Sequence, residues 1–230
     1  MRSTLVPITL SLPSGAPRTP GMHVSRIIGA IAVEAKILKD STAASLDLVE
    51  VSGHSERWWT SLDPTSQLRI AIGLAWERWY LAMLADVLDH PGEMCIEGIY
   101  MTHDGESLDV VVTERDEENH ILAVHEVKAT YKSVRTVANP FETQWMWTAQ
   151  TKAYAKGLGT TRVYLHILHL CGDYKYPISP SLGPDKSRHQ AWRADFTQDE
   201  IEENWDVLLG YVQHRQKQDA EDAMKDTEEA

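Results

Sequence analysis

The sequence predicts an α/β domain in which helices flank a mixed central sheet. Two apolar, β-branched runs at 107–113 and 121–128 are joined by a polar cluster at 115–119, which is typical of two antiparallel strands and their turn. An apolar run at 94–101 precedes them, and another at 162–170 follows a stretch with helical spacing. We therefore expect a helix, a three-stranded antiparallel meander, a helix and a further strand, with helical additions at both ends.

Length and composition describe one soluble globular domain. The chain has 230 residues, of which 43% are hydrophobic, and no apolar run approaches the length of a membrane span. Pro7 interrupts the short apolar patch at the N-terminus, which argues against a secretory signal. Cys95 and Cys171 lie far apart among apolar neighbours, as core thiols in a reducing cytoplasm do. We therefore expect a cytoplasmic protein with no membrane partner.

The charge is acidic and unevenly distributed. The net charge is −12, which argues mildly against a nucleic-acid partner. The eleven acids and three bases of residues 199–230 hold −8 of this −12, so the rest of the chain is close to balanced. We expect the acidic residues 216–230 to form a disordered tail.

The first half of the chain predicts an arm and two helices. Four prolines make residues 1–21 an extended or disordered arm. Isoleucines and alanines at spacings of three and four predict a helix over 26–39. A long helix is expected over 64–89, with Asp63 as its N-cap and Pro64 in its first turn. This helix is apolar nearly all round, which predicts that it is buried.

The second half predicts two more helices. One is expected over 141–156, ended by Gly157. Thr197 and Glu200 have capping-box spacing, which predicts a last helix to about Val212. The expected organisation is therefore an arm at 1–21, a single domain at 22–215 with its core at about 66–170, and the tail at 216–230.

Acidic and basic residues stand on the two expected strands of the hairpin. Side chains alternate across a strand, so Glu126 and Lys128 share one face. Pairing of the strands can bring Asp109 close to Glu126. Two carboxylates suit Mg²⁺ or Mn²⁺, and a nearby lysine can orient or deprotonate a water. Hydrolysis of a phosphodiester needs these groups, but a surface ion pair explains the spacing alone equally well.

Two further helical pairs bear on this site. Glu77 stands in the long apolar helix one turn after Gly73, where a carboxylate is costly unless it is paired, hydrogen-bonded or bound to metal. The alternative for Glu77 is an ion pair with an arginine or lysine at the helix surface. Gln150 and Tyr154 are four residues apart and so lie on one helical face.

These motifs, in this order, resemble those of the PD-(D/E)XK nuclease superfamily, most closely its RecB-like and phage lambda-exonuclease (YqaJ-like) branch. The resemblance covers about 66–170 and implies a restriction-endonuclease-like core. Leu108 stands where a proline often precedes the family's aspartate, and two cysteines are too few for the iron–sulfur cluster of some relatives. The matching motifs are Gly73-x-x-x-Glu77, Asp109, Glu126-x-Lys128 and Gln150-x-x-x-Tyr154.

The resemblance implies a role for each motif residue. Asp109, Glu126 and the Val127 carbonyl would bind one or two Mg²⁺ (or Mn²⁺) ions, and Glu77 would complete the metal shell. Lys128 would position and activate the attacking water. In the same way, Gln150 would hold Lys128 or a phosphate oxygen, Tyr154 would contact the DNA backbone or brace the helix, and the basic residues Lys132, Arg135, Lys152 and Lys156 would neutralise phosphates.

The function that the resemblance implies is metal-dependent hydrolysis of DNA, by an exonuclease of phage or prophage type in recombination or DNA processing. A structure-specific endonuclease is the first alternative. The second is a non-catalytic module that keeps the fold and uses its acidic tail to contact a basic partner. The implied partners are DNA, a single-strand annealing or recombination protein, and further copies of the chain, in the cytoplasm of a bacterial host.

Overall fold

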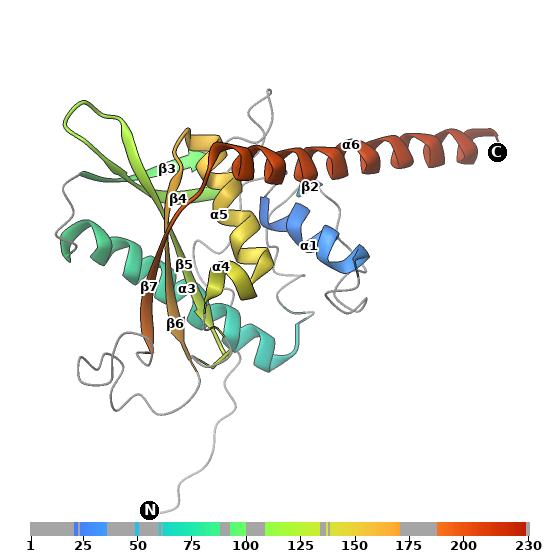
Figure 1. Cartoon of the computed structure of the whole chain (residues 1–230). Coiled ribbons are helices and arrows are strands. Elements are labelled where there is room, and N and C mark those ends of the chain that lie inside the picture. Colours follow the sequence, from blue (N-terminus) through green and yellow to red (C-terminus); the bar gives the residue numbers. More distant parts are fainter. Residues whose placement is uncertain are drawn as a thin grey trace, which may run out of the picture.

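In the computed structural model, helices cover both faces of a five-stranded sheet (Figure 1). The structure describes residues 21–22, 24–35, 49–50, 60, 62–87, 93–99, 109–133, 137, 139–170 and 188–228. The expected arm at 1–21 lies outside them, except for Gly21, which pairs in a short ribbon of β1 (Gly21–Met22) with β2 (Val49–Glu50).

The sheet has the strand order β3-β4-β5-β6-β7. The first three strands form an antiparallel meander, β5 and β6 pair in parallel, and β7 returns antiparallel to β6. The predicted helix, meander, helix and further strand are therefore confirmed, and the parallel pairing of β5 with β6 makes the sheet mixed, as expected. Strand β7 is an addition that the sequence did not predict. The strands are β3 (Glu93–Ile99), β4 (Asp109–Arg115), β5 (Ile121–Thr130), β6 (Arg162–His169) and β7 (His189–Asp195).

One helix packs on one face of β5 and β6, and two further helices pack against that helix. Val124 and Val163 on these strands are fully buried against Ala149 and Ala153 of the middle helix, and such small side chains let a helix approach a sheet closely. Gly159, in a left-handed conformation at φ 70°, ends this helix two residues later than expected. The helices are α1 (Val24–Glu34), α5 (Trp145–Leu158), preceded by the single turn α4 (Pro140–Thr143), and α6 (Gln198–Glu228).

Helix α3 (Pro64–Val87) packs against the other face. Asp63 caps it as predicted, because its Oδ1 accepts hydrogen bonds from the Thr65 and Ser66 amides. The predicted burial is wrong for the side chains described in 64–79, because none of them is buried and Leu68 is 48% exposed and Trp79 57% exposed, whereas Tyr80 is buried. No helix in the described part of the chain has the length and apolar character needed to cross a membrane.

A row of buried polar side chains joins α3 to the sheet, and we call it the histidine chain. The Tyr80 hydroxyl lies 3.0 Å from His166 Nδ1 and 2.7 Å from His189 Nε2. His166 Nε2 lies 3.0 Å from His125 Nδ1, and His125 Nε2 lies 3.7 Å from Glu114 Oε2. Burial raises the pKa of Tyr80 and lowers the pKa of His189, so both groups are held neutral.

Replacing Tyr80 by phenylalanine is expected to lower the free energy of unfolding by about 1–3 kcal/mol, because the buried His166 and the partly buried His189 each lose a hydrogen-bond partner. Urea denaturation measures the change. Tyr131→Phe is the matched control, because no described residue hydrogen-bonds to that hydroxyl and the side chain is 43% exposed. Equal stability of the two variants would mean that the hydrogen bonds of Tyr80 do not stabilise the fold.

Helix α6 begins as predicted and ends much later. Thr197 and Glu200 form the capping box, with the Thr197 amide 2.9 Å from Glu200 Oε2 and the Glu200 amide 3.2 Å from Thr197 Oγ1. The expected disorder of the tail is wrong, because the helix continues to Glu228 and its distal part projects from the body of the protein (Figure 1). After Gly210 the helix contains no glycine or proline, and ion pairs such as Lys217 with Glu221 support it.

Deleting residues 216–230 is expected to change the melting temperature by less than about 2 °C, because side chains 216–225 are exposed and contribute no core. Thermal unfolding followed by circular dichroism tests this expectation. A large fall in the melting temperature would show that the projecting helix packs against another part of the protein in solution.

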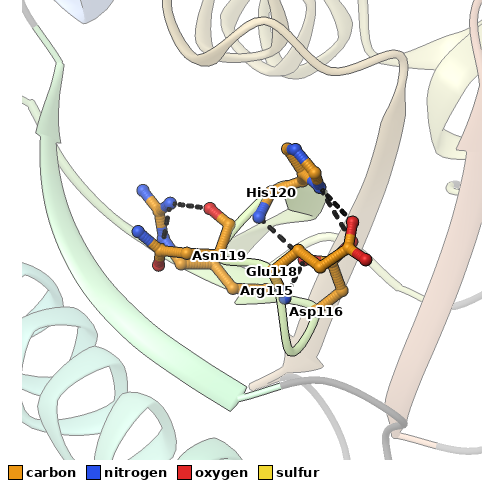
Figure 2. A network of polar contacts seen from close by, with 5 residues as sticks. All are labelled: Arg115, Asp116, Glu118, Asn119 and His120. Atoms are coloured by element: carbon orange, nitrogen blue, oxygen red, sulfur yellow. Dashed lines mark hydrogen bonds and ion pairs between the residues drawn. The ribbon is translucent and has the colours of Figure 1, made fainter.

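The turn between β4 and β5 has the polar geometry that its residues predict (Figure 2). Asp116 Oδ1 accepts hydrogen bonds from the amides of Glu118, at 3.0 Å, and His120, at 2.8 Å. Asn119 adopts φ 69°, and its carbonyl accepts a hydrogen bond from Arg115. This turn sets the register of the hairpin that carries the candidate site.

Candidate active site

Four of the predicted residues meet between β5 and α5, and we call them the tetrad. Lys128 Nζ donates one hydrogen bond to Glu126 Oε1 and another, of 2.8 Å, to Gln150 Oε1. Gln150 Nε2 in turn donates to the Tyr154 hydroxyl. The structure therefore joins the E-x-K pair of the strand to the Q-x-x-x-Y pair of the helix in one row of hydrogen bonds.

Strand and helix periods explain why the tetrad forms. Val124, Glu126 and Lys128 alternate onto the face of β5 that α5 covers. One helical turn separates Gln150 from Tyr154, so both side chains lie along the same line of α5. Tyr154 is only 2% exposed, so packing fixes its ring, and the ring fixes Gln150.

The tetrad is partly shielded from water. The side chain of Glu126 is 11% exposed and that of Lys128 is 21% exposed. Charges attract each other more strongly at such sites than at a fully hydrated surface, because the effective dielectric constant is lower. The ion pair and the Gln150 bond therefore hold the ammonium group in one position at the edge of the core.

Asp109 begins β4, beyond the part of this strand that pairs with β5. The pairing of β4 with β5 runs from Arg115 opposite Ile121 to Val112 opposite His125. Beyond that point β4 continues to Asp109 against β3, and β5 continues to Thr130 against β6. By alternation, position 109 shares a face of β4 with Thr113, which pairs with Val124 on the tetrad's face. The side chain of Asp109 lies outside the described part of the structure.

Glu77 and Val127 occupy the other side of the sheet. Glu77 is on α3, one turn before Tyr80, and its side chain is exposed rather than set on a buried apolar face. The expected desolvation cost at this carboxylate is therefore absent. The Val127 side chain is 7% exposed and alternates with Glu126 and Lys128, so it points away from the tetrad.

Two of the four predicted DNA-binding cations are paired with acids of α6. Lys156 forms an ion pair with Glu202, and hydrogen bonding from Lys156 lowers the pKa of this carboxyl. Lys152 Nζ lies 4.0 Å from Glu200 and 4.8 Å from the ring centroid of Phe196. These pairs leave both lysines partly neutralised.

The other two predicted cations differ. Arg135 lies outside the described residues. Lys132 is exposed at the end of β5, where its Nζ donates to Gln144 and lies 5.4 Å from the ring centroid of Trp147. Among the predicted DNA-binding cations that the structure describes, Lys132 is therefore the one whose side chain is exposed to solvent beside β5.

Asp116, Glu118 and His120 bring three potential metal-ligating atoms within 4.8 Å of one another (Figure 2). The hydrogen bonds of these residues belong to the hairpin turn, and the side chains of Glu118 and His120 are 81% and 70% exposed. Six residues of strand, about 20 Å, separate His120 from Glu126. This group is an exposed turn and not a part of the candidate active site.

Sequence reasoning missed two features near the site. One is the histidine chain, whose members come from five separate elements and share no local spacing. The other is Arg69 on α3, whose guanidinium lies 5.0 Å from the ring centroid of Tyr131. The position of Tyr131, three residues after Lys128, is a sequence signal for the second feature.

Among known proteins, some solved structures are similar to this chain, but no family is assigned to it. No protein-family model matches the chain, and no curated protein matches it either. An alkaline exonuclease from Laribacter hongkongensis, also solved in complex with dAMP, is 13% identical with a TM-score of 0.47 over 89% of this chain and 94% of its own. A phage-related exonuclease from Haemophilus somnus is 11% identical, with a TM-score of 0.37 over 87% of this chain and 97% of its own.

The architecture itself carries the comparison with the family that the motifs indicate. A helix, a three-stranded meander, a helix and a parallel strand follow one another in the described part of the chain. The E-x-K lysine and the glutamine of Q-x-x-x-Y are in direct contact. In element order, sheet topology and this contact, the chain resembles the PD-(D/E)XK nucleases of the RecB-like branch.

Proposed function

We propose that this chain is a metal-dependent nuclease that hydrolyses DNA phosphodiester bonds, as an exonuclease of phage or prophage type in recombination or DNA processing. The observation that carries the proposal is the tetrad, in which Lys128 is held between Glu126 and Gln150. A lysine used only for solubility needs no such fixed environment. Asp109, on the strand next to β5, is the second carboxylate that we propose for this chemistry.

The residues of the site fit a divalent cation. Asp109 and Glu126 are hard oxygen donors on adjacent strands, and Glu126 is largely shielded from water. The Val127 carbonyl is a further ligand that we propose, and Glu77, which α3 carries on the opposite face of the sheet, would join the metal through a bridging water. Mg²⁺ or Mn²⁺ bound there would stabilise the negative charge that develops on the phosphate oxygens during hydrolysis.

The side chains of the tetrad supply positioning and proton control. Lys128 Nζ would hold the attacking water in line with the scissile P–O bond and exchange protons with it. Gln150 and Glu126 keep Nζ in place, and Tyr154 keeps Gln150 in place. Preorganisation of this kind avoids the loss of a mobile lysine's entropy at the moment of reaction. The expected products carry 5′-phosphate and 3′-hydroxyl ends.

The proposal is tested with end-labelled linear duplex beside closed circular DNA, incubated with Mg²⁺, Mn²⁺ or EDTA. Metal-dependent loss of the linear DNA alone would establish an exonuclease, and the label would give its polarity. Cleavage of the circle would instead support the structure-specific endonuclease. Binding of DNA without cleavage in either metal would favour the non-catalytic module.

The proposed partners follow from the same activity. DNA is the substrate, and a single-strand annealing or recombination protein of the bacterial host's cytoplasm would receive the processed end. Assembly into a homo-oligomer is part of the same proposal. Sedimentation of the protein with and without DNA tests the assembly directly.

A further inference from the structure

Two exposed aromatic residues lie close to the C-terminal end of β5. Tyr131 directly follows this strand and is 43% exposed, and Trp145, the first residue of α5, is 40% exposed. Each of these two residues has a neighbour in the chain or in space that contacts another element. Lys132 donates to Gln144, which precedes Trp145, and Arg69 of α3 lies over the Tyr131 ring.

Two consecutive residues at this strand end each place an aromatic ring against a cation, on opposite sides of the sheet. Tyr131 turns toward α3, where the Arg69 guanidinium lies 5.0 Å from its ring centroid. Lys132 turns toward α5, where its ammonium lies 5.4 Å from the ring centroid of Trp147. Such cation–π pairs hold both partners in a defined orientation at an exposed site.

Arg69 is exposed, and among the described residues no carboxylate forms an ion pair with it. This is unusual in a chain with a net charge of −12, in which Lys152 and Lys156 both pair with acids of α6. A guanidinium presents a planar fork of donors that matches a phosphate. The guanidinium of Arg69 therefore has donors for an anionic ligand while its face rests on the tyrosine.

The distance from the tetrad is short. Tyr131 follows Lys128 by three residues, about 10 Å along an extended backbone. Stacked DNA rises 3.4 Å per nucleotide along one strand, so this length corresponds to about three nucleotides. Because Tyr131 faces α3 and Lys128 faces α5, a strand whose scissile phosphate lies at Lys128 would pass around the end of β5 and reach Tyr131 after at least about three nucleotides.

We propose that Tyr131 and Arg69 form a nucleotide subsite, in which a base stacks on the exposed part of the Tyr131 ring and Arg69 binds an adjacent phosphate. The subsite rests on the proposed nuclease function and extends it, because it would grip the substrate strand where the strand passes around the end of β5, at least about three nucleotides from the scissile bond. Base stacking on an aromatic ring tolerates every base, which suits an enzyme that must advance along any sequence.

Binding of a fluorescent single-stranded oligonucleotide in EDTA, where no cleavage occurs, tests the subsite. Tyr131→Ala is expected to weaken binding about tenfold, since stacking contributes on this scale, and Tyr131→Leu, which keeps the bulk, is expected to do the same. Tyr131→Phe keeps the ring and should bind within about twofold of the unsubstituted protein. Arg69→Ala should reduce the slope of log affinity against log salt by about one.

A scan with abasic nucleotides identifies the stacked base. With the unsubstituted protein, one abasic position near the cleaved end is expected to weaken binding about tenfold. With Tyr131→Ala the same position should have no further effect, because ring and base belong to one interaction and their losses are not additive. Equal losses in both proteins at every position would overturn the subsite.

The two proposals fail in different ways. An unsubstituted protein that neither binds nor cleaves DNA contradicts the nuclease proposal and the subsite together. Binding and cleavage that are unaffected by Tyr131→Ala and Tyr131→Leu contradict the subsite alone. Melting temperatures of all variants separate a lost contact from a lost fold.

Discussion

Replacing Lys128 with alanine is expected to lower the rate of metal-dependent DNA cleavage by about 10²- to 10⁴-fold. The ammonium is the group of the tetrad that can position and exchange protons with the attacking water, and alanine removes it with both of its hydrogen bonds. Single-turnover cleavage of a labelled duplex at saturating Mg²⁺ measures the effect on the chemical step, separately from the effect on binding.

Two controls accompany the Lys128 variant. Lys217→Ala removes a lysine that is 78% exposed on the projecting half of α6, and it is expected to cleave DNA at the unsubstituted rate. Lys128→Arg keeps the positive charge but changes its shape and raises its proton affinity, so it should recover little activity. Full activity in Lys128→Ala would exclude this lysine from the chemistry.

Replacing Glu126 with glutamine is the second change with a large expected effect. Glutamine keeps the shape of the side chain and removes the charge, so it leaves Lys128 without its ion-pair partner and the metal without a carboxylate. We expect cleavage to fall by at least about 10²-fold. We also expect Mn²⁺ to lose the ability to raise the melting temperature, because a ligand stabilises a protein only through its affinity for the folded state.

The exposed hairpin turn provides the matched control for this experiment. Glu118→Gln removes one carboxylate of the Asp116, Glu118 and His120 group. It is expected to leave both cleavage and the Mn²⁺-induced rise in melting temperature unchanged. Should Glu118→Gln abolish the Mn²⁺ effect while Glu126→Gln does not, the metal binds at the turn and the proposed site is wrong.

The sequence predicted the meander and the tetrad because their signals are local. The alternation of Glu126 and Lys128 on β5, and the four-residue spacing of Gln150 and Tyr154 on α5, each place two side chains on one face. The small side chains of Ala149 and Ala153 then let α5 pack closely on β5, which brings the two pairs together. The resemblance of motifs offered Lys128 or a phosphate oxygen as the partner of Gln150, and the structure shows the contact with Lys128.

Strand β7 escaped prediction because its buried side is polar. Gln190 is 5% exposed on this strand, and its Oε1 accepts from Trp192 and lies 3.4 Å from His169. A buried glutamine satisfied by such partners breaks the alternation of apolar and polar residues that identifies a strand. The partner His169 is 21 residues away in the sequence, so no local pattern reveals the bond.

Long-range pairing also explains the errors at the cations and at the tail. The partner of Lys156 is Glu202, 46 residues later on α6, so the lysine's neutralisation has no local signature. The acidic composition of residues 216–228 suggested disorder, but it also contains strong helix formers that continue a helix already begun on the core. The composition of the segment reports its net charge, whereas a helix extends from the turn that has already formed before it.

The histidine chain has a consequence for where its protons reside. The Glu114 carboxylate, 3.7 Å from His125 Nε2, favours a proton on that nitrogen, so a neutral His125 accepts from His166 at Nδ1. His166 then accepts from Tyr80, and Tyr80 accepts from His189. Each member of the histidine chain thus donates its proton toward the next, from His189 on β7 to Glu114 on β4, and the tautomer of one histidine fixes the tautomers of the other two. Nitrogen NMR of the imidazoles would record this direction, and loss of any one member would release the others from it.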